Sequence, residues 1–118
     1  YSVLLALLLI NRVSSQNVHV VNATLHKSVI LPCSANRTQK AVFWLYNETI
    51  KVCDIIGGVM NLDEQNELYN NRVETFSSEF PKGNFSIKLN QLKMSDAGNY
   101  TCNFSEIPTP KRIQLNVT

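Results

Sequence analysis

The chain has few of the residues from which catalytic and metal sites are built. Of its 118 residues only two are histidine and three are cysteine, and His19 and His26 stand near no nucleophile or carboxylate at a useful spacing. The four glycines form no phosphate-binding loop. No group of His, Cys, Asp or Glu residues has metal-ligand spacing. The sequence therefore predicts no enzyme, no metal site, no cofactor and no small-molecule substrate.

The chain also lacks a large excess of positive or negative charge. The chain has 11 Lys and Arg residues against 9 Asp and Glu, which gives a net charge of +2, and these residues are scattered along it. Nucleic-acid binding and polybasic membrane contact both need a concentrated basic patch, so neither kind of partner is expected. A hydrophobic content of 44% is enough for a core, and 118 residues suffice for one domain but not for two.

Only one long hydrophobic run is present, near the N-terminus. Residues 3–10 are apolar without a break, which is too short for the roughly 20 residues that a membrane-spanning helix needs. With Val13 and Ser15 behind it, this run fits a secretory signal peptide over residues 1–15. A buried strand or short helix is the alternative. Because the chain begins at Tyr1 without Met or a basic stretch, we expect the signal to be N-terminally incomplete.

A high density of N-glycosylation sequons also indicates the secretory route. The Asn-x-Ser/Thr pattern occurs seven times, at Asn22, Asn36, Asn47, Asn84, Asn99, Asn103 and Asn116. Each glycosylated asparagine must face solvent, so each sequon also predicts a side-chain direction. We expect an extracellular protein, with any membrane anchor beyond the C-terminal end of this chain.

After Gln16 the apolar residues repeat with period two in short runs separated by turn residues, a pattern typical of an all-β sandwich. The alternating sets are Val29, Leu31 and Cys33; Val42, Trp44 and Tyr46; Phe85, Ile87 and Leu89; Tyr100 and Cys102; Ile113, Leu115 and Val117. Gly57 with Gly58, and residues 81–83, indicate turns. The polar residues 61–71 are interpreted as a solvated loop rather than as an acidic or metal site.

Four residues have spacings that are found together in one large family. Cys33 precedes Trp44 by eleven residues, and Tyr100 stands two residues before Cys102. Over residues 16–118 the chain therefore resembles an immunoglobulin domain. The resemblance implies an inter-sheet disulfide between Cys33 and Cys102 that packs against Trp44, and a corner hydrogen bond from Tyr100.

The long interval between these cysteines resembles the variable type of immunoglobulin domain, which has two extra strands. The resemblance places them at residues 49–54 and 55–60, and it implies a structural salt bridge between Arg72 and Asp96. Cys53 is left over from the disulfide. A partly buried small side chain, an intermolecular disulfide and a disulfide to another part of the full-length protein are all open for it.

Three segments, residues 71–76, 81–89 and 95–98, resemble the butyrophilin-like and T-cell costimulatory-ligand group. Residues 111–118 lack the glycine-rich joining motif of antibody and T-cell-receptor chains. The resemblance implies a single-pass membrane protein, external to the plasma membrane, that binds a receptor on lymphocytes and modulates T-cell activation. An immune-type receptor or a homophilic adhesion molecule is the alternative.

The candidate partner-binding residues are apolar and predicted to face outward. With Trp44 directed inward, Phe43 and Leu45 point away from the core, and large apolar residues in that position suggest an interface. Phe104 and Ile107 lie near the loop before the last strand and are predicted to add an apolar rim. Packing under a neighbouring loop, or a homodimer contact, is the alternative for Phe43 and Leu45.

The sequons on the last strand but one bear on this interface. Asn99 and Asn103 alternate with the inward-facing Tyr100 and Cys102, so both are expected to face outward on the same sheet as Phe43. Glycans at both positions would shield part of that sheet. The interface would then lie toward Phe43 and the two extra strands.

Overall fold

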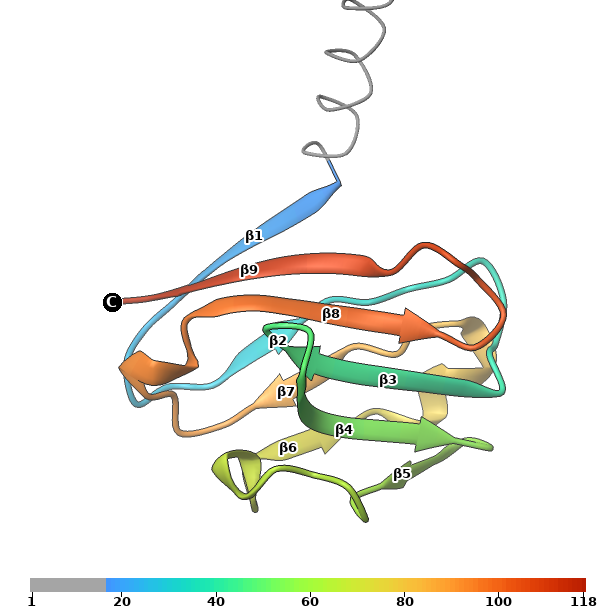
Figure 1. The fold of residues 1–118 in the computed structure, drawn as a ribbon, viewed down its shortest axis with the longest axis horizontal. Coiled ribbons are helices and arrows are strands. Elements are labelled where there is room, and N and C mark those ends of the chain that lie inside the picture. The colour runs from blue at the N-terminus through green and yellow to red at the C-terminus, as the bar shows by residue number, and fades with distance from the viewer. Residues whose placement is uncertain (1–16) are drawn as a thin grey trace, which may run out of the picture.

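The computed structural model describes residues 17–118, and the predicted signal peptide lies outside the described residues. Within them, nine strands and three short 3-10 helices follow one another (Figure 1). In chain order they are β1 (Val18–Ala23), β2 (Val29–Leu31), β3 (Ala41–Tyr46), β4 (Ile50–Ile56), β5 (Val59–Asn61), η1 (Glu67–Tyr69), β6 (Val73–Thr75), η2 (Ser77–Lys82), β7 (Ile87–Leu89), η3 (Met94–Asp96), β8 (Gly98–Phe104) and β9 (Lys111–Val117).

The strands form two sheets that pack face to face. The larger sheet has six strands in the order β1-β9-β8-β3-β4-β5, and the smaller has three in the order β2-β7-β6. Figure 1 shows the smaller sheet behind the larger one. Strand β1 runs parallel to β9, whereas β9 is antiparallel to β8. This is the all-β sandwich that the alternating apolar residues predict.

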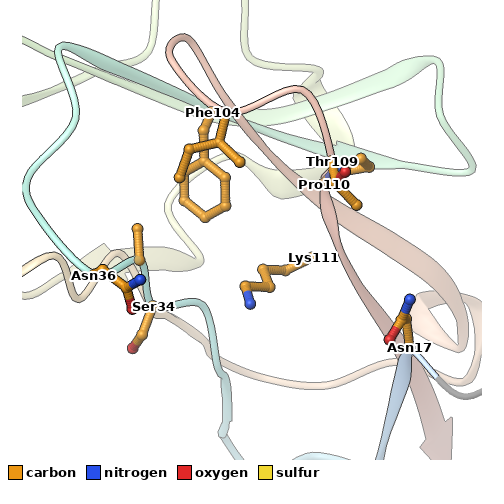
Figure 2. A pocket seen from close by; sticks show the side chains of 9 residues that line it. Asn17, Ser34, Asn36, Phe104, Thr109, Pro110 and Lys111 are labelled. Carbon is orange, nitrogen blue, oxygen red and sulfur yellow. The ribbon is translucent and has the colours of Figure 1, made fainter.

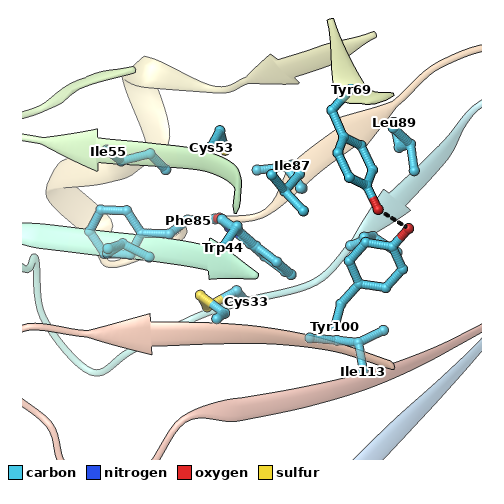
Figure 3. Packing of buried hydrophobic residues seen from close by; sticks show 14 of the residues in the cluster. Cys33, Trp44, Cys53, Ile55, Tyr69, Phe85, Ile87, Leu89, Tyr100 and Ile113 are labelled. Carbon is cyan, nitrogen blue, oxygen red and sulfur yellow. Dashed lines mark hydrogen bonds between the residues drawn. A yellow bond between two sulfur atoms is a disulfide. The ribbon is translucent and has the colours of Figure 1, made fainter. Parts of the chain in front are cut away.

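The core lies between the sheets around one tryptophan. Trp44 on β3 is fully buried, and its indole Nε1 donates a hydrogen bond to the carbonyl oxygen of Phe85 at 3.0 Å. The disulfide between Cys33 and Cys102 joins the two sheets beside it (Figure 3). The cysteines are 69 positions apart, and closing a loop of that length stabilises the fold by about 4 kcal/mol in the chain-entropy account. The predicted pairing is confirmed.

The two extra strands are present, but the predicted boundary between them was wrong. The structure continues β4 to Ile56 and turns at Gly57 and Gly58, rather than changing strand between residues 54 and 55. Both glycines have positive φ, 59° and 77°. A two-residue hairpin of the type that matches strand twist requires positive φ at both positions, and glycine adopts it without a steric cost.

Most residues of the polar segment 61–71 are exposed, as a solvated loop predicts, but the segment also contacts the rest of the fold. It folds back along β4, where the Asn66 N–H donates to the carbonyl oxygen of Lys51 at 2.9 Å. The short helix η1 then buries the ring of Tyr69, whose hydroxyl lies 3.0 Å from that of Tyr100 (Figure 3). Burial raises the pKa of Tyr69 to about 12 and also raises that of Tyr100, so both phenols stay neutral. One buried aromatic ring therefore anchors a segment that is otherwise polar.

The predicted pair of Arg72 and Asp96 joins the start of β6 to the short helix η3. Both guanidinium Nη atoms donate to the carboxylate, each at 2.8 Å, and both side chains are buried. The hydrogen bonds to Asp96 raise the pKa of Arg72. The hydroxyl of Tyr100 donates to the backbone carbonyl of Asp96 at 2.7 Å, which is the corner bond that the resemblance implies. These contacts fix the turn that leads into β8.

Candidate functional site

The face of the six-stranded sheet that points away from the core is the candidate interaction surface. On β3, Trp44 is buried, while its neighbours Phe43 and Leu45 point outward and remain half-buried. The register places Phe43 opposite Asp54 and Leu45 opposite Lys51 on β4. Outward apolar side chains on β3 therefore share one face with two charged side chains on β4.

An ion pair on this face holds the ring of Phe43. The Nζ atom of Lys51 lies 2.7 Å from Oδ1 of Asp54 and 4.7 Å from the centre of the Phe43 ring. Asp54 is only 5% exposed, so the carboxylate is largely withdrawn from water and its charge is balanced by the lysine. The cation over the ring adds a favourable contact. The outcome is an apolar, charge-balanced surface.

A β-bulge decides which residues of β4 face outward. The register between β3 and β4 shifts between Trp44 and Leu45. As a result Val52 and Cys53 are adjacent in sequence and both fully buried, whereas Lys51 faces outward over Phe43. Simple alternation does not predict the phase of β4, because a bulge inserts one extra residue.

Two exposed apolar residues extend the surface at the β4–β5 turn. Ile56 is 45% exposed and Val59 65% exposed, and they stand opposite each other on the two strands. Neither was predicted as a site residue. Their position beside a Gly-Gly hairpin is the signal that could have found them. The outward residues of β3, β4 and β5 are called the β3–β5 surface and comprise Phe43, Leu45, Lys51, Asp54, Ile56 and Val59.

The predicted apolar rim at Phe104 is wrong. Phe104 is only 8% exposed, and its ring packs edge-on against that of Phe85, 6.5 Å away between centres. It follows Tyr100 and Cys102 on the inward side of β8, so the same alternation that buries them also buries Phe104. Ile107 is partly buried against the core cluster.

Phe104 and Ile107 line a hollow of about 350 Å³ at one end of the sandwich (Figure 2). Its wall is formed by the loop after β2 and the loop between β8 and β9, and the side chains of Ser34, Asn36 and Lys111 reach toward it. The hollow is open to solvent at a loop end, and it does not join the β3–β5 surface.

Four sequon asparagines lie on the other half of the outer face. Asn99 and Asn103 are on β8, and Asn22 on β1 stands directly opposite Asn116 on β9. Asn22 and Asn99 are exposed, whereas Asn103 and Asn116 are half-buried. The strands β1, β9 and β8 thus carry sequons on this face, and the β3–β5 surface contains no sequon asparagine.

The remaining three sequons lie in segments between the strands. Asn36 and Asn47 are exposed in loops. Asn84 is half-buried, and its Nδ2 donates to Oε1 of Glu79 at 3.2 Å. None of the three belongs to the β3–β5 surface, and Asn47 lies in the turn between β3 and β4 at its edge.

The position of Cys53 favours a small buried side chain over a disulfide to another chain or to another part of the full-length protein. The residue stands opposite Trp44 and is fully buried in the core cluster. Burial raises the pKa of its thiol to about 12, so the reactive thiolate is almost absent at neutral pH. Cys53 is a small core side chain.

The histidines and carboxylates form no metal centre in the part of the chain that the structure describes. Within residues 17–118, no three His, Cys, Asp or Glu side chains come together to hold an ion. His19 is exposed on β1, and His26 lies in the turn after it with a φ of 71°. None of the helices among residues 17–118 has the length and apolar character to cross a membrane.

Comparison with known proteins starts from the sandwich, its inter-sheet disulfide and its two extra strands. The family model described as the immunoglobulin V-set domain matches residues 16–118. The chain belongs to the immunoglobulin V-set family. The extra strands β4 and β5, which extend the larger sheet, are the feature that separates this set from the constant type.

Curated relatives of this V-set domain match it over part of their length. It is 38% identical over 85 residues to the CD276 antigen homolog of Xenopus laevis. The aligned residues cover 66% of this chain and 27% of that protein. It is 36% identical over 45 residues to V-set domain-containing T-cell activation inhibitor 1 of Rattus norvegicus, covering 38% of this chain and 16% of that protein. The chain thus spans about a quarter or less of these relatives.

Solved structures show the same fold. The human B7-H4 IgV-like domain superimposes with a TM-score of 0.73 at 23% identity, over 81% of this chain and 90% of that one. Bovine butyrophilin gives a TM-score of 0.73 at 22% identity, over 84% of this chain and 50% of that one. These structures show the shared fold, and the resemblance to the butyrophilin-like and costimulatory-ligand group is confirmed by the family model together with the 38% identity to the CD276 antigen homolog.

Proposed function

We propose that this V-set domain is an extracellular recognition module of a cell-surface protein, and that it binds a protein receptor on lymphocytes to modulate T-cell activation. Membership of the V-set family supports a binding role rather than catalysis. The similarity to a protein named as a T-cell activation inhibitor supports the biological context. Whether the outcome is activating or inhibitory depends on the receptor.

The observation that carries this proposal is the β3–β5 surface. It presents the aromatic ring of Phe43 and the exposed side chains of Ile56 and Val59. The opposite charges of Lys51 and Asp54 on this surface balance each other. Aromatic and aliphatic anchors in a flat, charge-balanced setting are typical of the centres of protein interfaces. A sheet face suits a protein partner better than a small molecule, which needs a concave site.

A screen of the domain against lymphocyte receptor ectodomains tests the proposal. We expect one receptor to bind, and we expect Phe43→Ala to weaken that binding by at least about tenfold, because interface anchors lose on that scale when truncated. Met94→Ala is the control, since Met94 is also an exposed apolar residue but lies in η3, outside the β3–β5 surface. Circular dichroism establishes that each variant is folded.

Two results would contradict the proposal. The first is a receptor that binds the domain equally well with and without Phe43. The second is stable self-association in analytical ultracentrifugation that Phe43→Ala abolishes, with no receptor bound. That second result would identify the domain as a homophilic adhesion module.

A further inference from the structure

The four sequons on the outer face differ in how free their amide nitrogens are. We propose that in the folded protein Asn22 and Asn99 carry glycans. Asn103 and Asn116 are unmodified, and their side-chain amides form hydrogen bonds with neighbouring residues of the sheet. The inference goes beyond the proposed function and does not depend on it, since it concerns only the chemistry of these side chains.

The chemistry of glycan attachment sets the criterion. An oligosaccharide is transferred from a lipid-linked pyrophosphate donor, and its anomeric carbon forms a bond to the asparagine Nδ2. The bond between that carbon and the pyrophosphate oxygen breaks, the lipid pyrophosphate leaves with the electron pair, and Nδ2 loses one proton. A modified asparagine therefore retains a single N–H. Because the sugar is added before the strands fold, the criterion is whether the folded sheet can form around that single N–H and leave open space for the sugar.

Asn103 fails this criterion because both of its N–H groups are used. Nδ2 donates to the carbonyl oxygen of Phe43 at 3.0 Å and to Oγ1 of Thr101 at 3.0 Å. The residue is half-buried, and the hydroxyl of Thr101 lies in a buried side chain. A sugar on Nδ2 would remove one of these bonds and leave a half-buried acceptor without its donor.

Asn116 is held between two neighbours at the seam of β1 and β9. Its Nδ2 donates to Oδ1 of Asn22 at 3.0 Å, and its Oδ1 accepts from Nε2 of Gln114 at 3.3 Å. Adjacent strands are about 4.8 Å apart, which is too narrow for two sugar rings side by side at directly opposed residues. One glycan can therefore occupy this pair.

Asn22 is the better placed member of the pair, because it is exposed whereas Asn116 is half-buried. Among the described residues its side chain is exposed and uses only Oδ1, as an acceptor, so Nδ2 is free. A glycan on Nδ2 leaves the bond from Asn116 intact. Asn99 is likewise exposed on β8, and within residues 17–118 its amide makes no side-chain hydrogen bond.

The consequence is a divided outer face. Glycans at Asn22 on β1 and at Asn99 on β8 cover the strands on one side of the six-stranded sheet. The β3–β5 surface on the other side remains accessible. Because Asn103 lies directly opposite Phe43, its unmodified amide keeps a bulky sugar away from that ring.

Glycan-site mapping on the full-length protein from the surface of a secretory cell line tests the proposal. Enzymatic release of N-glycans in heavy-oxygen water converts each occupied asparagine to labelled aspartate, which mass spectrometry locates. We expect label at Asn22 and Asn99 and native asparagine at Asn103 and Asn116. Label at Asn103 or Asn116 in most molecules, or its absence from Asn22 or Asn99, would overturn the proposal.

Matched variants separate occupancy from the hydrogen bond itself. Thr24→Ala and Thr118→Ala destroy the sequons of Asn22 and Asn116 while keeping both asparagines, and both threonines are exposed. Thr24→Ala should remove one glycan from the protein on a gel, and Thr118→Ala should leave its mobility unchanged. If Thr118→Ala removes a glycan, or if Thr24→Ala merely moves the glycan to Asn116, the assignment is wrong.

Discussion

Among single residues, Asp96 is expected to contribute strongly to stability, because it is the buried partner of Arg72. Asp96→Ala leaves the guanidinium buried without its partner, so we expect the free energy of unfolding to fall by about 3–5 kcal/mol in urea denaturation. The control is Glu48→Gln, which breaks an exposed pair with Arg112 and should cost about 0–1 kcal/mol. Similar losses in the two variants would contradict the assignment of Asp96 as a buried structural partner.

Cys53 gives a second prediction at the same scale. Its burial and its raised pKa, about 12, leave almost no accessible thiolate, so iodoacetamide at pH 8 should label it only after the domain unfolds. Peptide mass spectrometry with and without denaturant measures this. Rapid labelling of the native domain, or a covalent dimer on a non-reducing gel, would show that the thiol reaches the surface.

Among the elements, the start of β8 depends on Gly98. Its φ is 144°, and a Cβ there would lie 2.8 Å from both Cε1 and Oη of Tyr46. Gly98→Ala should therefore combine backbone strain with displacement of a packed ring, at a cost of about 2–4 kcal/mol in urea denaturation. Gly58→Ala, at positive φ but with open space around it, should cost only about 1–2 kcal/mol. The reverse order would mean that Tyr46 does not constrain this turn.

The elements also differ in how well the sequence predicts them. Strand β9 alternates between buried and less buried positions over most of its length, and the inward residues of β3 and β8 also recur at every second position, although the outward Thr101 is buried as well. Strand β1 was not predicted, because Val18 and Val20 are exposed while the inward Val21 and Ala23 are only partly buried, which leaves little contrast.

The errors at the candidate site have particular physical causes. The β-bulge opposite Trp44 removes the alternation on β4, so the outward position of Lys51 requires the structure. The burial of Phe104 could have been predicted, since it continues the inward set of Tyr100 and Cys102. Two side-chain hydrogen bonds separate Asn103 from Asn99. The bond to Phe43 crosses from β8 to β3, so no local pattern in a sequon contains it, whereas the bond to Thr101 lies within β8.

For the whole molecule, the two halves of the larger sheet have different surfaces. Strands β1, β9 and β8 carry the sequons, and β3, β4 and β5 carry apolar side chains around one ion pair. The smaller sheet has its own exposed apolar residue, Ile30 on β2. Val59 on the larger sheet and Ile30 on the smaller sheet are both exposed apolar residues, so substitutions at the two positions show which face of the sandwich binds a partner.

The most direct test of partner binding through the β3–β5 surface is lymphocyte staining with fluorescent multimers of the domain that carry one arginine on either face. Val59 is 65% exposed and Ile30 is 52% exposed, so neither arginine should disturb the core. We predict that Val59→Arg lowers binding at least about tenfold, since an unpaired charge introduced into the apolar part of an interface is strongly unfavourable. Ile30→Arg should bind like the wild type. Equal binding by the two variants, or a loss with Ile30→Arg alone, would contradict the account.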